Sequence, residues 1–233
     1  MTKIYYGCDE LSRGWGHYFK QCNALELDVE KFDALPKTAT LNRWRVDSPR
    51  GFCFVLNADS VFINALMRLS ARGADELDEA TRTAWKENLE RAKALAAKAI
   101  LIRTPPELTP GPASRKLMTR VAEELVMPAK PAVIWQADGL WQLKDTRDFA
   151  ESVGFVYALD PFIAQREEIP FTHGDAAWVL TERAGLRRKF DQFDMEALVD
   201  LAEPYDRIFC LLRGRFKWDH ARELRVVLDY EMG

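Results

Sequence analysis

Eight short runs of apolar residues recur along this chain at fairly even intervals, and this rhythm constrains the fold more than any other feature. Most runs are followed by a polar or Gly/Pro-marked break and then by residues with helical spacing. A continuous apolar run is typical of a strand buried on both faces, and alternation of such strands with helices indicates a parallel sheet. Eight strand–helix units predict an α/β fold, a TIM-type (β/α)8 barrel. The predicted strands are residues 3–7, 23–27, 52–57, 99–103, 132–136, 155–160, 176–180 and 207–212.

The length and composition suit one such barrel. The chain has 233 residues, close to the roughly 250 usual for this fold, so we expect a single domain over residues 1–233. Hydrophobic residues make up 48% of the chain, enough to fill a barrel interior and the layer between sheet and helices. The net charge of −3 argues against a protein whose whole surface binds nucleic acid.

The cellular compartment is predicted from the apolar runs and the cysteines. The N-terminal residues lack the long apolar region of a signal peptide, and no run approaches the ~18 residues of a membrane span. We therefore expect a cytoplasmic protein with no membrane partner. Cys8, Cys22, Cys53 and Cys210 show no C-x-x-C spacing and lie in or beside predicted strands. Buried free thiols are the simplest interpretation, and spacing leaves a reactive thiol open.

Helical periodicity is clearest over Asp75–Lys98, where apolar residues form one face. Asp194 and Asp219 are expected N-caps of two later helices. Residues 160–175 hold no clear long helix, so the sixth crossover of the barrel is expected to be shortened or irregular. The other predicted helices are a short one within 11–21, one within Pro36–Trp44, and Ser114–Val126, Trp141–Ser152, Asp194–Ala202 and Asp219–Tyr230.

The runs and the residues around them follow the motif order of a known family. The motifs are IYYGC with Trp15 and Phe19, NALEL, the Leu35–Pro36 pair, Trp44, PRGFCFVLNA, IRTPPEL, and VIWQADGLW ending at Trp141. Through them the chain resembles the YecE-like family, domain of unknown function family seventy-two, over nearly its whole length. The resemblance implies a TIM-type barrel.

Several polar positions depart from the pattern of that family. Glu26 is kept, while Asp28 stands where Asn is usual and Asn57 where Lys is usual. Arg103 replaces a Gln before the double proline, and Trp135 replaces a Glu of the fifth strand. The chain is thus identified as a divergent member of the family. The resemblance implies that it keeps the fold of the family, while its activity differs or is lost.

Ligand sites of TIM-type barrels lie at the C-terminal ends of the strands, so polar residues at those ends are the candidates. Glu26 comes first, because it lies inside an apolar run. In a strand Glu26 and Asp28 face the same side, and two carboxylates there could divide acid and base roles as catalytic residues. The alternative is a structural buried ion pair, with Arg103 as the expected neighbour that offsets the buried charge.

The exits of the seventh and eighth strands are basic, reading TERAGLRRKF and LRGRFKW. Phosphate sites in TIM-type barrels are frequently built from these two loops and a helix N-terminus. The alternative is a solvated basic rim that pairs with acidic residues of neighbouring helices. The predicted ligand-binding residues are Arg187, Arg188, Arg213 and Arg215 at these exits, with Asn57, Arg103 and Trp135 at others.

Metal and nucleotide-cofactor signatures are missing from the sequence. The 3 histidines stand in no ligand spacing, and there is neither a G-x-G-x-x-G nor a Walker sequence. We therefore expect no cofactor and no metal site, with Mg²⁺ on the carboxylates of Glu26 and Asp28 left open.

Three functions fit these observations. The first is an enzyme, a hydrolase or lyase that acts on a phosphate- or sugar-containing ligand. The second is a non-catalytic protein that binds a nucleotide or a nucleic-acid strand, and the third is a scaffold with a vestigial pocket. The departures from the family pattern argue against the first function and favour the other two. The sequence leaves turnover, ligand identity and oligomeric state open, and it favours a phosphorylated or sugar ligand over nucleic acid.

Overall fold

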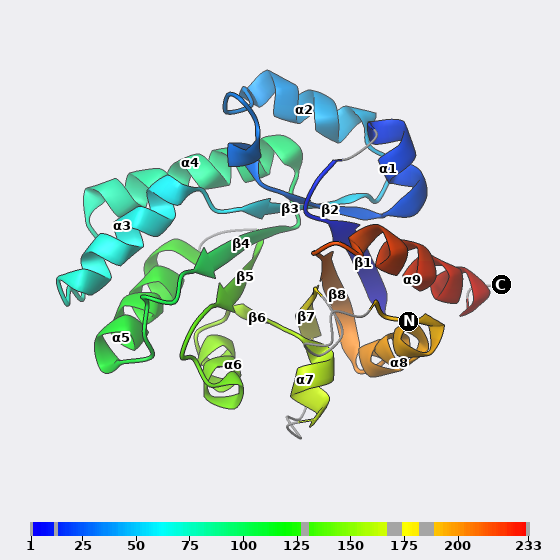
Figure 1. Ribbon diagram of the computed structural model, residues 1–233. Helices are drawn as coiled ribbons and strands as arrows, with labels where there is room; N and C mark the ends of the chain where they lie inside the picture. Colours follow the sequence, from blue (N-terminus) through cyan, green and yellow to red (C-terminus); the bar gives the residue numbers. More distant parts are fainter. Residues whose placement is uncertain (1, 12–13, 127–130, 167–173, 182–188, 232–233) are drawn as a thin grey trace. The chain divides into compact units, whose positions relative to one another are not determined.

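A computed structural model describes residues 2–11, 14–126, 131–166, 174–181 and 189–231 (Figure 1). All eight strands predicted from the apolar runs are present, and the α/β fold class is confirmed. Their order is β1-β8-β7-β6-β5-β4-β3-β2. The bounds are β1 Lys3–Cys8, β2 Ala24–Leu27, β3 Cys53–Asn57, β4 Ala99–Thr104, β5 Ala132–Ala137, β6 Val156–Leu159, β7 Gly174–Leu180 and β8 Tyr205–Leu212.

The chain divides into two compact units, and the first comprises Met1–Glu26, Pro49–Cys53 and Ala158–Gly233. In this unit β1 and β7 pair with β8 in parallel, and the end of β6 pairs with β7. Cys8 lies opposite Leu212, so the residues that follow β1 and β8 emerge at the same edge. The helices of the unit are α1 Trp15–Gln21, α7 Pro161–Arg166, α8 Gln192–Ala202 and α9 Lys217–Glu231, of which α8 and α9 lie side by side (Figure 1).

The second unit comprises Leu27–Ser48 and Phe54–Tyr157. Its strands β3, β4 and β5 pair in parallel, and the start of β6 pairs with β5. The apolar residues of β4 are buried up to Ile102, as expected of a strand covered on both faces. The helices are η1 Val29–Lys31, α2 Thr38–Asp47, α3 Ser60–Ala71, α4 Glu79–Leu95, α5 Pro112–Val121, η2 Ala122–Val126 and α6 Leu143–Ser152.

Two of the predicted helix starts are wrong by a few residues. Asp191, and not Asp194, is the N-cap of α8, because its side chain accepts from the backbone N–H of Asp194. Asp194 returns the contact by accepting from the N–H of Asp191, which completes a capping box. Asp219 is likewise no N-cap and lies in the first turn of α9, where a carboxylate favours the positive end of the helix dipole.

The described part of the sixth crossover contains the six-residue helix α7. Residues 167–173 lie outside the described residues, so the shortened or irregular crossover stays a prediction. The helix α3, in contrast, was not predicted. It begins directly after its N-cap Asp59, whose carboxylate accepts from the N–H of Phe62 at 3.0 Å. Its apolar residues Phe62, Ala65, Leu66 and Leu69 recur at helical spacing and are buried.

The four cysteines are free and buried, as the sequence predicts. No helix among the described residues has the length and apolarity needed to cross a membrane.

Candidate functional site

A buried ion pair joins the ends of β2 and β8 in the first unit. The guanidinium of Arg213 donates from Nε to Oε2 of Glu26 and from Nη2 to Oε1, both at 2.8 Å. The Glu26 side chain is 3% exposed and that of Arg213 10%. A carboxylate held by two parallel N–H groups is the strongest geometry of this pair, and it offsets the cost of burying both charges. The buried ion pair predicted for Glu26 therefore exists, and the partner that the structure shows is Arg213.

The local contacts of Asn23 and Gly7 hold the start of β2 beside β1. The side chain of Asn23 accepts from the N–H of Tyr6 at 2.7 Å and donates to the carbonyl of Ile4 at 2.9 Å. A Cβ on Gly7 would lie only 1.9 Å from the carbonyl oxygen of Ala24. Glycine thus allows the start of β2 to approach β1 closely, and two residues 187 positions apart meet as a result.

A second ion-pair group lies where β1 ends and α9 begins. Lys217, the first residue of α9, donates to Asp9 at 2.7 Å and lies 3.1 Å from the carboxylate of Glu10. Burial acts to lower the pKa of Lys217, but its hydrogen bonds to Asp9 and Glu10 outweigh this and raise that pKa above its ordinary value. Asp9 follows Cys8 and Arg213 follows Leu212, so both ion pairs occupy the same edge of paired strands.

The turn between β8 and α9 supplies a further cation. Gly214 takes φ 77°, a conformation that favours glycine, and a Cβ there would lie 3.0 Å from the carbonyl oxygen of Thr181. Arg215 is exposed, and its guanidinium lies 4.4 Å from the centre of the Phe216 ring. We name these charged residues the C-terminal cluster, after the C-terminal ends of the strands at which they lie: Asp9, Glu10, Glu26, Arg213, Arg215 and Lys217.

The hydroxyl of Tyr18 joins the end of β1, which precedes Asp9, to the start of β2. It accepts from the N–H of Cys8 at 2.9 Å and donates to the carbonyl of Ala24 at 2.7 Å, which ties β1 to β2. Burial raises the pKa of Tyr18 well above its ordinary value, so the hydroxyl keeps its proton. The neighbouring Cys8 thiol is hydrogen-bonded to Cys22, and this bond together with burial raises the pKa of Cys8. Sequence periodicity gives no signal for such a support, because Tyr18 reads as an ordinary residue of a helix face.

Four of the sequence-predicted site residues lie in the second unit. Asp28 follows β2 and caps η1, where its carboxylate accepts from the N–H of Glu30 at 3.0 Å. Asn57 ends β3 and is half-buried. Arg103 is exposed and pairs with Asp138 at 3.0 Å. These three are polar strand-end residues, as expected.

Trp135, the fourth, packs inside the second unit. Its side chain is fully buried, its Nε1–H donates to the Thr104 hydroxyl at 3.1 Å, and its ring lies 5.0 Å from that of Trp141 and 5.9 Å from that of Phe149. An aromatic residue with these contacts fills the core around α6. Arg187 and Arg188, also predicted to bind ligand, lie outside the described residues.

Comparisons with known proteins agree with this architecture. The sequence model of the family described as "Protein of unknown function DUF72" matches residues 5–153. No curated protein matches the sequence.

Among solved structures, a DUF72 family protein from Thermotoga maritima is 11% identical, with a TM-score of 0.72 over 97% of this chain and 99% of its own. A DUF72 family protein from Enterococcus faecalis is 12% identical, with a TM-score of 0.68 over 98% of each chain. Endonuclease IV from Thermus thermophilus is 14% identical, with a TM-score of 0.56 over 99% of this chain and 100% of its own. Likeness at such identities shows the fold, and it confirms the predicted TIM-type (β/α)8 barrel.

Proposed function

We infer that this chain, which belongs to the DUF72 family of proteins of unknown function, binds a sugar-containing ligand at the C-terminal cluster, with a phosphate on that ligand as a secondary contact. The observation that carries this proposal is the Glu26–Arg213 pair, because it sets an acceptor and a donor side by side at the edge where TIM-type barrels hold their ligands.

The charge balance of the cluster decides between sugar and phosphate as the main recognition element. The cations Arg213 and Lys217 each contact a carboxylate, and the cluster holds as many carboxylates as cations. A site built for phosphate alone would present a surplus of donors. A sugar hydroxyl both donates and accepts, so it suits a lining in which carboxylates and guanidinium groups alternate.

The same balance argues against a nucleic-acid strand as the ligand. Binding of a nucleic-acid backbone depends on cations that replace its counterions. Carboxylates of the cluster already contact Arg213 and Lys217. The endonuclease among the structural neighbours shares the fold of this chain at 14% identity, and that likeness does not extend to a substrate.

For Glu26 we propose a binding role. Both oxygens of its carboxylate accept from Arg213, so the carboxylate is fixed in orientation and would accept a hydrogen bond from a ligand hydroxyl along other lone-pair directions. Asp28, the predicted partner in acid–base chemistry, uses its carboxylate to cap η1. The pair of Glu26 and Asp28 as a catalytic dyad thus remains a prediction, and binding is the proposal that the contacts support.

A thermal-shift series tests the binding proposal. D-ribose, D-ribose 5-phosphate and inorganic phosphate are each added at millimolar concentration, because a ligand that binds only the folded state raises Tm. We expect both sugars to raise Tm, and ribose 5-phosphate to raise it most. In Arg213→Lys the charge stays but the two-pronged contact is lost, so the rise should disappear.

Arg207→Lys is the matched control, since Arg207 makes the same kind of contact near the other end of β8. The control should keep the full rise in Tm. An absent rise with all three compounds, or an equal rise in Arg213→Lys and the wild type, would overturn the proposal and leave the pair as a structural tie.

Two further proposals complete this assignment. The four free, buried cysteines are compatible with a reducing compartment, and we place the protein in the cytoplasm. We also propose that residues 1–233 form one cooperative domain. Urea unfolding followed by tryptophan fluorescence and by circular dichroism should then give a single, coincident transition, whereas two separated transitions would contradict it.

A further inference from the structure

Two of the free cysteines lie in contact within the first unit. Cys8 is the last residue of β1, and Cys22 directly follows the last residue of α1. Their thiols are hydrogen-bonded to each other, although a loop and a helix separate them in the sequence. Two thiols in contact need only a small movement to reach the roughly 2.05 Å between the sulfurs of a disulfide. The fold therefore brings two nucleophilic side chains together as a pair.

The residue Tyr18 holds both cysteines in place. Its hydroxyl accepts from the N–H of Cys8 at 2.9 Å, and its carbonyl accepts from the N–H of Cys22 at 3.0 Å. The Tyr18 hydroxyl is also hydrogen-bonded to the Cys22 side chain. Tyr18 itself is fully buried, so it anchors the two cysteines to the core.

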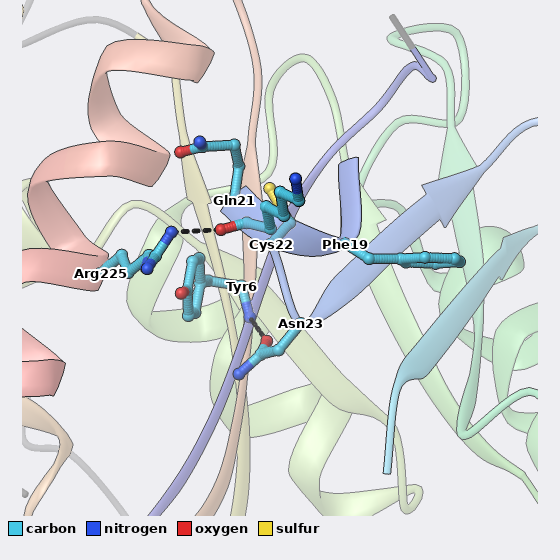
Figure 2. A pocket seen from close by; sticks show the side chains of 7 residues that line it. Tyr6, Phe19, Gln21, Cys22, Asn23 and Arg225 are labelled. Atoms are coloured by element: carbon cyan, nitrogen blue, oxygen red, sulfur yellow. Dashed lines mark hydrogen bonds between the residues drawn. The ribbon is translucent and has the colours of Figure 1, made fainter. Parts of the chain in front are cut away.

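A pocket beside Cys22 admits small molecules. It has a volume of about 440 Å³, and Cys22, Lys20 and Arg225 are among the residues that line it. Figure 2 shows Cys22 and Arg225 around this pocket, with Arg225 hydrogen-bonded to the carbonyl of Lys20. One water occupies about 30 Å³, so a molecule a little larger than water enters a pocket of this size. Such a molecule reaches Cys22 first, because Cys8 is fully buried behind it.

The surroundings of the two thiols differentiate their chemistry. The hydrogen bond with Cys8 lowers the pKa of Cys22 below its ordinary value, against the opposing effect of burial, and the Tyr18 hydroxyl acts in the same direction as Cys8. The same hydrogen bond, together with burial, raises the pKa of Cys8. The thiolate is the nucleophilic form of cysteine. Cys22 is thus the attacking thiol, and Cys8 is its protonated neighbour.

Cys210 provides the contrast within the same unit. It lies within β8 and is fully buried, and burial raises the pKa of its thiol. A thiol that stays protonated in apolar surroundings is inert toward oxidants. Burial alone therefore does not give a reactive cysteine in this fold, and the contact with Cys8 and the pocket distinguish Cys22.

We propose that Cys8 and Cys22 form a reactive dithiol that reduces a small peroxide and becomes a disulfide. The Cys22 sulfur attacks one oxygen of the peroxide, the O–O bond breaks, and the second oxygen takes up the proton of the thiol and leaves as water. Cys22 is thereby oxidised to a sulfenic acid. The Cys8 sulfur then attacks the Cys22 sulfur, the S–O bond breaks, and the hydroxyl leaves as water with the Cys8 proton. Two thiols and one hydrogen peroxide thus give one disulfide and two waters.

The first step prepares Cys8 for the second. A sulfenic acid at Cys22 no longer presents a thiolate to Cys8, so the main cause of the raised pKa of Cys8 is removed. The nearby ammonium of Lys217 lowers that pKa, and the carboxylate of Asp9 opposes it. Cys8 therefore gives up its proton more readily once Cys22 has been oxidised.

Peptide mapping of the oxidised protein tests the proposal. Trypsin separates all four cysteines, because they lie in residues 4–13, 21–31, 51–68 and 208–213 of the sequence. The folded protein is treated with a small excess of hydrogen peroxide, the remaining thiols are blocked with N-ethylmaleimide in urea, and the peptides are identified by mass spectrometry. We expect a species that joins 4–13 to 21–31 and that dithiothreitol separates. Cys53 and Cys210 should lose their thiols about tenfold more slowly or less.

Two variants, each with its Tm measured, test the order of the steps. In Cys8→Ser the reaction should stop at the sulfenic acid of Cys22, which dimedone traps. Cys210→Ser is the matched control and should form the disulfide within about twofold of the wild-type rate.

The wild-type peptide map decides the proposal even if a variant fails to fold. Absence of the 4–13 to 21–31 species overturns the proposal, and so does a disulfide from Cys22 to Cys53 or Cys210. A Cys8→Ser protein that keeps the wild-type Tm but gains no dimedone on Cys22 also overturns it.

Discussion

Near the two ends of β8 stand two arginines, each holding a carboxylate with two N–H groups, yet their surroundings differ. Arg213 holds Glu26 with side chains 10% and 3% exposed, whereas Arg207 holds Asp175 with side chains 42% and 19% exposed. The chemistry of the contact is the same, so burial alone separates the two pairs.

The difference in burial determines what each ion pair contributes to the stability of the fold. An exposed ion pair contributes little to stability, because water and salt screen its charges. A buried pair is also a weak source of net stability, but removal of one partner leaves an uncompensated charge. The pair at the C-terminal end is thus fixed in place by its own burial, which suits a binding site. The Arg207–Asp175 pair at the N-terminal end of β8 is exposed, so its loss should cost little stability.

The largest expected effect comes from removal of one arginine at each end. Arg213→Met leaves the carboxylate of Glu26 buried without a partner and should lower the free energy of unfolding by about 3–5 kcal/mol. Arg207→Met should lower it by about 1 kcal/mol or less. Urea unfolding of the two variants measures both values. Equal losses would contradict the distinction between the two ends.

The next effect is the pH dependence of the free energy of unfolding that His220 produces. Burial lowers the pKa of His220 to about 4, and the neutral ring accepts from the N–H of Phe190 at 3.0 Å. The unfolded chain binds this proton near pH 6.5, so the stabilising contribution is complete above that pH. It is lost as the pH falls from 6.5 toward 4, by up to about 3 kcal/mol.

Comparison of the wild type with His220→Gln isolates this histidine from the carboxylates that also titrate. The difference in unfolding free energy between the two proteins should shrink as the pH falls through that window. His17→Gln, at an exposed histidine, is measured alongside as a control for the loss of one histidine. A constant difference between wild type and His220→Gln from pH 7 to 4 would show that His220 is not held neutral.

A smaller effect is expected from Gly7, whose missing side chain lets β2 approach β1. In Gly7→Ala the new Cβ meets the carbonyl oxygen of Ala24, so the start of β2 must shift and stability should fall by about 1–3 kcal/mol. Gly16→Ala is the control, since it lies in α1 with open space around it and should raise stability by about 0.5–1 kcal/mol. Unfolding curves that show no loss for Gly7→Ala would remove the close approach as the reason for the position of Glu26.

The smallest effect concerns salt. At 1 M NaCl the screening length is about 3 Å, so the cost of Arg207→Met should approach zero while that of Arg213→Met changes little. Unfolding of both variants at low and high salt gives the comparison. A strong salt dependence of the Arg213→Met cost would mean that water reaches the Glu26–Arg213 pair freely.

The order of elements could be predicted from the sequence because strands buried on both faces read as apolar runs, and all eight were found this way. The partner of Glu26, in contrast, could not be predicted from the sequence. Arg103 lies near the end of β4 and Arg213 directly follows β8, and the choice between them depends on which strands are neighbours and on their register. A single sequence contains no measure of either quantity.

Trp135 shows a second limit of sequence reasoning. It belongs to a strand whose two faces are both covered, so its position alone does not say whether the ring faces a ligand or a helix. The structure places the ring against Trp141 and Phe149 around α6. The N-cap of α8 was missed for a local reason, because Asp191 and Asp194 are both members of one capping box and either reads as a cap.

The most direct test of the account is the crystal structure of the protein soaked with D-ribose 5-phosphate. We expect a sugar with hydroxyl groups within hydrogen-bond distance of Glu26 or Arg213 and the phosphate near Arg215 or Lys217. Ribose 5-phosphate bound elsewhere on the molecule, with the C-terminal cluster left to solvent, would contradict it.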